Sequence, residues 1–347
     1  MASFNRLTSE DITVSTDKVV SNTWSGDTNM LTTMYTASTT TTFTTATSQG
    51  NFFINVFGQN LVGGGSGTTA TTASVQFSIS YGEKNGSGSE HFTPTSGALG
   101  NTATKVVYNQ YRQLVFGDES SNFTFNGHES SDIWVINVNR ARYKHSLKAG
   151  SLNLTLADGT NNTHLTDDSV TLTGSATITN LGRQFNIVSG SNGQAIGNSI
   201  AQVANSSSYG LFYPDAGIIL LNPDNFGGNL AAVKNTGVSS NTDLNHRKLF
   251  LAISGAKHFI VDSQEKVTSQ YYFTRAKNNE FNYTTNPSFV DANGDVNIDS
   301  FINNPQTFIT TVGLYNDNND LVAVAKLSQP VTKDFTKEAL IRVKLDY

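Results

Sequence analysis

The chain contains no cysteine among its 347 residues. This absence excludes disulfide bonds, thiolate metal sites and cysteine nucleophiles. A chain of this length can fold without such cross-links, because it can bury a sizeable apolar core. The sequence also lacks any apolar run that approaches the roughly 20 residues of a membrane-spanning helix. We therefore expect no insertion into a membrane.

Charge is scarce as well, since only 14% of the residues are charged and the formal net charge is −5. Binding nucleic acid requires clustered Lys and Arg to neutralise phosphates, so this weak acidic balance argues against it. The opening segment Met1–Thr16 has no basic region followed by an apolar stretch, and we expect no secretory signal there. Abundant Gly, Ser, Thr and Asn predict a neutral polar surface, which is common in β-rich extracellular and virion proteins.

Alternating and β-branched patterns predict strands along most of the chain. In Ala73–Tyr81, apolar residues at every second position put Val75, Phe77, Ile79 and Tyr81 on one face. Near the end, the polar cluster Asn316–Asp320 predicts a turn between two strands. The predicted strands are Asp11–Val20, Met30–Thr47, Asn51–Phe57, Ala73–Tyr81, Ile133–Asn139, Ser151–Leu156, Val170–Thr177, Phe185–Val188, a pair within Gly210–Leu221, Lys266–Ala276, Phe308–Tyr315, Leu321–Leu327 and a last strand around Ile341–Leu345.

Two segments predict helices. Asn101–Phe116 has Thr102 or Thr104 as a cap and Gly117 as a stop signal. Its predicted apolar face contains Val106, Val107, Gln110, Tyr111, Leu114 and Val115. A second helix is predicted at Thr242–Ser254, with Thr242 as its cap.

These patterns predict an α+β, β-rich fold with mostly antiparallel sheets, a few helices and an inserted β domain. The chain exceeds the roughly 250–300 residues at which single cores stop growing, so more than one compact part is expected. Residues 158–241 change to short strands broken by Gly, Asn and Ser. We predict a discontinuous platform domain made of residues 1–157 and 242–347, with residues 158–241 inserted as a β-rich domain.

No residue pattern specifies a reaction. The six histidines, at positions 91, 128, 145, 164, 246 and 258, form no metal-binding pattern, and His128-Glu129 is interpreted as a pair of polar residues in a solvent-exposed loop. No G-x-S-x-G elbow is present. The carboxylate pairs Asp118-Glu119 and Asp167-Asp168 lie in polar, turn-like contexts. We therefore predict no catalytic, cofactor-binding or metal-binding residue, and a protein that is not an enzyme.

Three weaker motifs have structural explanations. Gly63–Gly67 is followed by threonines without lysine, which favours a flexible hairpin loop over a phosphate cradle. Asp291–Asp299 resembles the start of a calcium loop, but Val296 and Ile302 occupy the positions that require Gly and Glu. A turn is favoured, and calcium binding by Asp291, Asn293 and Asp295 stays open. If Arg140–Lys148 formed a strand, four cationic side chains would lie on one face. They would then either bind an acidic partner or protect a sheet edge from pairing.

Several segments resemble virion proteins of contractile-tailed bacteriophages, particularly T-even-like myophages of cyanobacteria. The resemblance is carried by Ser21–Thr36, Tyr108–Phe125, Val135–Leu156, Arg275–Val290 and the C-terminal segment. There, the GLYNDNNDLVAVAKL stretch (Gly313–Leu327) is similar to a hairpin of proteins that join tail fibres to a baseplate. Together these segments cover roughly half the chain, and residues 158–241 do not contribute.

The resemblance implies a structural subunit of the tail baseplate, assembled in the host cytoplasm and located in the virion. Its partners would be other tail or baseplate proteins, including tail fibres, and it would act in several copies. Two alternatives remain open at this point. A carbohydrate-binding module would use exposed aromatics, with Tyr209, Phe212 and Tyr213 as candidates. A polysaccharide-degrading enzyme would need a paired-carboxylate cleft.

Overall fold

The computed structural model describes residues 4–36, 53–58, 74–88, 103–159, 161–172, 175–196, 208–232, 245–283 and 287–347. The chain forms two compact units. Unit 1 consists of Met1–Lys18 and Lys266–Tyr347, and unit 2 consists of Val19–Glu265. The predicted Thr39–Thr45 strand region and the Gly63–Gly67 loop lie outside the described residues.

Unit 2 is built on a large sheet of 13 described strands. Their order is β2-β17-β10-β11-β13-β15-β16-β8-β5-β4-β3, with β12 and β14 pairing to β13. The strands are β2 Met30–Leu31, β3 Tyr35–Thr36, β4 Phe53–Phe57, β5 Val75–Glu83, β8 Asp132–Val138, β10 Asn153–Ala157, β11 Asn162–Asp167, β12 Thr177–Thr179, β13 Gly182–Ser191, β14 Gln194–Ala195, β15 Gly210–Tyr213, β16 Ile218–Leu221 and β17 Phe259–Ile260.

Short elements complete unit 2. They are β6 Phe123–Phe125, β7 His128–Ser130, β9 Ser146–Leu147, α1 Ala103–Phe116, α2 Asn245–Ala256 and the 3-10 turns η2 Arg140–Arg142, η5 Pro223–Asn225 and η6 Gly228–Leu230. The β-rich, mostly antiparallel fold class with few helices is therefore confirmed. None of the described helices is long and apolar enough to cross a bilayer.

The two units meet between residues 18 and 19 and between residues 265 and 266, and not at the predicted boundaries 157/158 and 241/242. Strand β8, from the predicted platform, lies between β5 and β16, and β16 comes from the region predicted as an insertion. Hydrogen bonds from Ile218↔Asn137 to Leu221↔Trp134 make these strands parts of one sheet. Strands from both sides of residue 158 thus share one continuous sheet, because strand pairing joins segments that are far apart in sequence.

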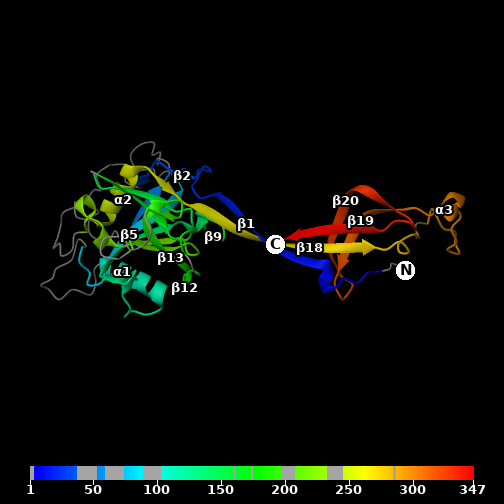
Figure 1. Cartoon of the computed structure of the whole chain (residues 1–347), viewed down its shortest axis with the longest axis horizontal. Coiled ribbons are helices and arrows are strands. Elements are labelled where there is room, and N and C mark those ends of the chain that lie inside the picture. The colour runs from blue at the N-terminus through cyan, green and yellow to red at the C-terminus, as the bar shows by residue number, and fades with distance from the viewer. Residues whose placement is uncertain are drawn as a thin grey trace, which may run out of the picture. The chain divides into compact units, whose positions relative to one another are not determined.

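Two hydrophobic cores cover opposite faces of this sheet. In β8, Trp134 and Ile136 belong to the first core, whereas Ile133 and Val135 belong to the second. This division follows from the alternation of side chains along a strand. Helix α2 contributes to the first core and α1 to the second, and Figure 1 shows the two helices on either side of β5.

Helix α1 confirms the predicted helix, and its predicted apolar face is partly right. Val107 and Val115 are buried as predicted, whereas Val106 and Leu114 are exposed and Tyr108 and Arg112 are buried. The ring of Tyr108 packs edge-on against Phe123, with centroids 5.1 Å apart, and Arg112 lies over the Tyr108 ring. These contacts with distant residues rotate the helix away from the face that its own apolar spacing favours.

Two further strand predictions are wrong. At the start of the predicted Val170–Thr177 strand, the chain forms a turn in which the N–H groups of Thr171 and Leu172 donate to Asp168 O. The basic segment Arg140–Lys148 contains the 3-10 turn η2 and the two-residue strand β9 instead of one strand. The Asn139 side chain caps η2 by accepting from Ala141 N, so the cations do not line one face.

Burial of His246 in α2 predicts a pH dependence of stability. Desolvation lowers the pKa of His246 from 6.5 to about 4. The unfolded chain therefore binds a proton that the folded chain excludes between these values, and stability falls as the pH drops through this range. From about pH 7.5 to about pH 4.5, wild type should lose about 2–3 kcal/mol more than His246→Gln. Urea unfolding followed by tryptophan fluorescence measures this difference.

That comparison isolates the histidine from other groups. Burial raises the pKa of Asp167 and Asp168, which acts in the opposite direction in the acid range. Both carboxyl groups are present in wild type and in His246→Gln, so their effect cancels. Equal pH dependence of the two proteins would contradict the assignment to His246.

Unit 1 contains two small sheets. Its strands are β19 Thr307–Tyr315, β20 Leu321–Lys333 and β21 Ala339–Asp346, and α3 covers Asp299–Asn303. Strands β1 Ile12–Asn22 and β18 Asp262–Ala276 contain the two unit boundaries, and the 3-10 turn η1 (Ser9–Asp11) precedes β1. The first sheet has the order β1-β18-β21, and β9 also pairs with β18. The second sheet is the hairpin β19–β20 (Figure 1).

The hairpin turn is the predicted one. Asn316 Oδ1 accepts from the backbone N–H groups of Asn318 and Asp320, and Asn319 has φ 63°, in the left-handed region. Strand β20 continues past the predicted end at Leu327. The register passes from Thr311↔Lys326 to Ile309↔Val331, so a bulge opposite Thr310 accommodates Pro330, which has no N–H to pair.

Candidate assembly surface

The two candidate carboxylate pairs do not form a catalytic cleft. Asp118 accepts from the hydroxyl and backbone of Ser121 and from the Ser120 backbone, which lowers its pKa to about 2. Asp167 ends β11 and Asp168 begins the turn that follows, so the predicted turn context holds for Asp168, and both residues are buried. Asp167 Oδ2 accepts from Gly150 N at 2.7 Å, and Asp168 accepts from the backbone and amide of Asn186. These carboxyl groups hold neighbouring segments together.

A polar network around Asp224 was not visible in the sequence, because it joins residues almost 100 positions apart. Asp224 Oδ2 accepts from Ser130 Oγ at 3.1 Å and lies 3.3 Å from His128 Nε2. Ser130 also bonds to Asp132, which accepts from Tyr81 Oη at 2.8 Å. The serine hydroxyl therefore faces two acids, whereas a hydrolase needs it bonded to the imidazole. The network joins β7 to η5.

Two of the three aromatic residues named as candidates for glycan binding are not available on the surface. Phe212 and Tyr213 are fully buried, one in each core, because they are neighbours in strand β15. Tyr213 Oη donates to Gln184 Oε1 at 3.0 Å. Tyr209 is partly exposed and packs on Phe226 with ring centroids 5.5 Å apart. The three residues therefore do not form one exposed aromatic site.

The Asp291–Asp299 segment contains the predicted turn. Asp291 Oδ1 accepts from the N–H groups of Asn293 and Asp295, each at 2.9 Å, and Gly294 has φ 88°. Within the described residues, no three His, Asp or Glu side chains gather as a possible metal site. The turn thus explains the spacing of these polar residues.

Unit 1 differs from unit 2 in that its described residues form no hydrophobic core cluster. Every residue of both core clusters belongs to Val19–Glu265. Among the described apolar residues of unit 1, only Ala276, Ala339 and Val343 are buried. A compact unit of about 100 residues normally has a core of its own. Unit 1 instead leaves large apolar side chains exposed to solvent.

Six of the large apolar side chains that unit 1 exposes lie on the hairpin. They are Phe308, Tyr315, Leu321, Val322, Val324 and Val331, with exposed fractions from 38% to 66%. On one face Val312 and Leu314 lie opposite Ala325 and Ala323, and all four are only partly buried. The opposite face, which we call the exposed hairpin face, presents Tyr315 and its partner Leu321 together with Val324, the partner of Gly313. An isolated two-stranded hairpin is marginally stable in water, so both apolar faces favour a covering partner.

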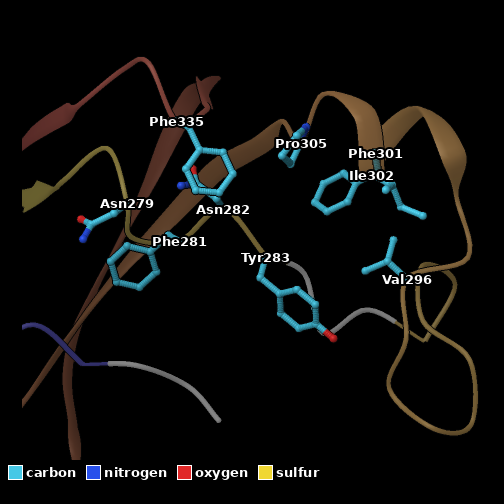
Figure 2. Close-up of a pocket in the computed structure, with 9 residues that line it drawn as sticks. All are labelled: Asn279, Phe281, Asn282, Tyr283, Val296, Phe301, Ile302, Pro305 and Phe335. Atoms are coloured by element: carbon cyan, nitrogen blue, oxygen red, sulfur yellow. The ribbon is translucent and has the colours of Figure 1, made fainter.

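An apolar hollow of about 360 Å³, open to solvent, lies elsewhere in unit 1. Figure 2 shows Phe281, Tyr283, Ile302 and Phe335 around it, together with Phe301, Val296 and Pro305. The first four side chains are each 41–57% exposed. Tyr283 Oη donates to Gly294 O, which anchors one wall to the Asp291 turn. No charged side chain lines this hollow.

A buried lysine holds the base of the hairpin. Lys333 is fully buried, and its Nζ donates to Asn278 O, Asn282 Oδ1 and Asp334 O, each at 2.9 Å. The three acceptors use all three ammonium protons. Lys333 therefore ties the end of β20 to residues 278–282, and three of these, Asn279, Phe281 and Asn282, line the hollow.

Comparison of the chain with protein-family models, with curated proteins and with solved structures finds no match.

Proposed function

We propose that this chain is a non-enzymatic structural subunit of a bacteriophage tail baseplate, which assembles with other virion proteins through unit 1. The observation that carries the proposal is the distribution of apolar side chains. Unit 2 buries most of its large apolar residues in two cores, whereas unit 1 exposes most of its own, many of them on the hairpin and around the hollow. Large contiguous apolar surfaces of this kind mark sites of association. The resemblance of Gly313–Leu327 to a fibre-joining hairpin suggests tail fibres or baseplate neighbours as the partners.

Covering the exposed apolar surface of unit 1 offsets most of the free-energy cost of docking. Burying a large apolar side chain completely contributes about 1.5–3 kcal/mol, so covering one that is half exposed contributes about 1 kcal/mol. The six exposed apolar residues of the hairpin and the four around the hollow would together contribute on the order of 10 kcal/mol. That gross gain is comparable to the about 4–15 kcal/mol that association costs in lost freedom. Several contacts per subunit are therefore needed, as in a baseplate.

Charges placed on the exposed hairpin face are expected to abolish assembly. We predict that Leu321→Lys combined with Val324→Lys weakens binding to tail proteins at least about 100-fold, because two ammonium groups would be buried without partners. Light scattering after size-exclusion chromatography of the full chain with purified tail proteins of its phage measures complex formation. Tryptophan fluorescence should be unchanged.

The matched control is Ile178→Lys, which changes an exposed apolar residue of β12 in unit 2. This variant should assemble like wild type. If the double variant assembles normally, the hairpin is not the docking surface. Intact, infectious particles purified without this chain would refute the baseplate function itself.

A further inference from the structure

Strand β19 has an open edge. Among the described residues it pairs only with β20, from Thr307↔Lys333 to Tyr315↔Leu321. Outside this ladder, no described backbone N–H or C=O bonds to the backbone of Thr307–Tyr315, while the Thr307 hydroxyl donates to Phe281 O and the Phe4 ring packs on Tyr315. Its second edge therefore presents backbone N–H and C=O groups that a further strand can pair with.

The sequence of β19 lacks the features that protect such edges. Natural proteins protect open edges with charged residues, proline or bulges. Strand β20 carries Lys326, Pro330 and the bulge, and β21 carries Arg342, Lys344 and Asp346. Strand β1 carries Asp17 and Lys18. In contrast, β19 reads TFITTVGLY and has neither charge nor proline. Of the described strands of unit 1, β19 is therefore the one with an open edge that lacks these protecting features.

We propose that two copies of this chain associate by antiparallel pairing of β19 with β19 of the second copy, which rests on the proposed assembly role of unit 1. A twofold contact of this kind satisfies two identical open edges at once, because the same strand serves as both partners. The absence of charge means that the paired strands bring no like charges together. The product is a four-stranded sheet, β20-β19-β19-β20, with the protected β20 edges outermost.

The size of this contact predicts a weak dimer. Pairing would bring together the large apolar side chains of β19, which are Phe308, Ile309, Val312, Leu314 and Tyr315. Phe308 and Tyr315 are about half exposed, whereas Ile309, Val312 and Leu314 are already partly buried, so the contact buries less than about 1,000 Å² in total. That is below the size of a stable specific interface, so we expect a dissociation constant in the micromolar range or weaker.

The absence of cysteine allows a direct test, because one introduced cysteine is the single thiol of the chain. We would place cysteine in turn at Thr310, Thr311 and Val312, near the centre of β19, and oxidise the full chain. Two cysteines on paired strands near the twofold axis meet the about 4.4–6.8 Å between Cα atoms that a disulfide requires. At least one of the three variants should form a covalent dimer in high yield.

Two control variants separate this contact from random collision. Lys326→Cys places an exposed thiol on β20 directly opposite Thr311, at the outer edge of the hairpin. Ile178→Cys places one on unit 2, where the side chain is 72% exposed. Neither should cross-link. If no β19 variant cross-links, or if the controls cross-link as efficiently, the pairing is refuted.

The two proposals can fail separately. Suppose that the wild-type chain stays monomeric by light scattering up to about 100 μM and still binds purified tail proteins. That result would refute the β19 pairing and leave the assembly role intact. A chain that forms the β19 disulfide but binds no tail protein would support the pairing and refute the baseplate function.

Discussion

Replacing Lys333 with methionine is expected to unfold the base of the hairpin and lower the stability of unit 1 by about 3 kcal/mol. Methionine keeps an unbranched apolar stem but removes the three donors to Asn278 O, Asn282 Oδ1 and Asp334 O. Each buried acceptor left without a donor costs about 1–3 kcal/mol. Relief from burying the ammonium group offsets part of that sum. The loss is large for a unit without a core cluster.

Hydrogen exchange resolves this effect by region. Peptides covering residues 277–283 and strands β19 and β20 should exchange faster in Lys333→Met, because local opening sets the exchange rate. Both tryptophans belong to unit 2, so fluorescence should report no change there. Lys326→Met is the matched control, since that lysine is exposed on the same strand. Unchanged exchange in Lys333→Met would show that the three hydrogen bonds do not support the hairpin.

Replacing Trp134 with alanine is expected to lower the free energy of unfolding of unit 2 by about 3–5 kcal/mol. The indole is fully buried, and its ring contacts Tyr81 and Phe226. Its Nε1 donates to Asn245 O at 3.0 Å, at the start of α2. The substitution therefore removes apolar contacts, leaves a cavity and takes away the hydrogen bond that joins β8 to the helix.

Urea unfolding, monitored by circular dichroism and by the fluorescence of the remaining Trp24, measures this loss. Trp24 lies in the same core, with its ring centroid 4.9 Å from that of Phe259. Ile178→Ala serves as the control, because exposed substitutions usually change stability by less than about 0.5 kcal/mol. A loss below about 1 kcal/mol in Trp134→Ala would mean that the core collapses around the gap.

The two substitutions should affect different parts of the chain. Lys333→Met acts on the unit that we propose to assemble, and Trp134→Ala acts on the unit with both cores. We therefore expect Lys333→Met to reduce binding to tail proteins while unit 2 stays folded. Sites without shared partners contribute additively to stability.

The local features of the fold followed from the sequence. Alternation in Ala73–Tyr81 correctly placed Phe77, Ile79 and Tyr81 in one core. The turn at Asn316–Asp320 followed from the Asn316 side chain, which bonds backbone groups two and four residues later. Such signals are readable because all of the interacting atoms lie within a few residues.

Tertiary structure decided which side chains are buried and which segments belong together. Arg112 and Lys333 are buried although their residue type predicts exposure. Arg112 donates to Asn122 Oδ1 in the loop that follows its helix, and Lys333 donates to Asn278 O and Asn282 Oδ1, more than 50 residues away. Strand β8 pairs with β5 on one side and with β16 on the other. The predicted domain boundary at residue 158 therefore does not separate two sheets. The exposed apolar hairpin also escaped prediction, since its strands have the same pattern as buried ones. A pattern identifies a strand, but only the neighbours that pack against it determine whether its apolar face is a core or a surface left for a partner.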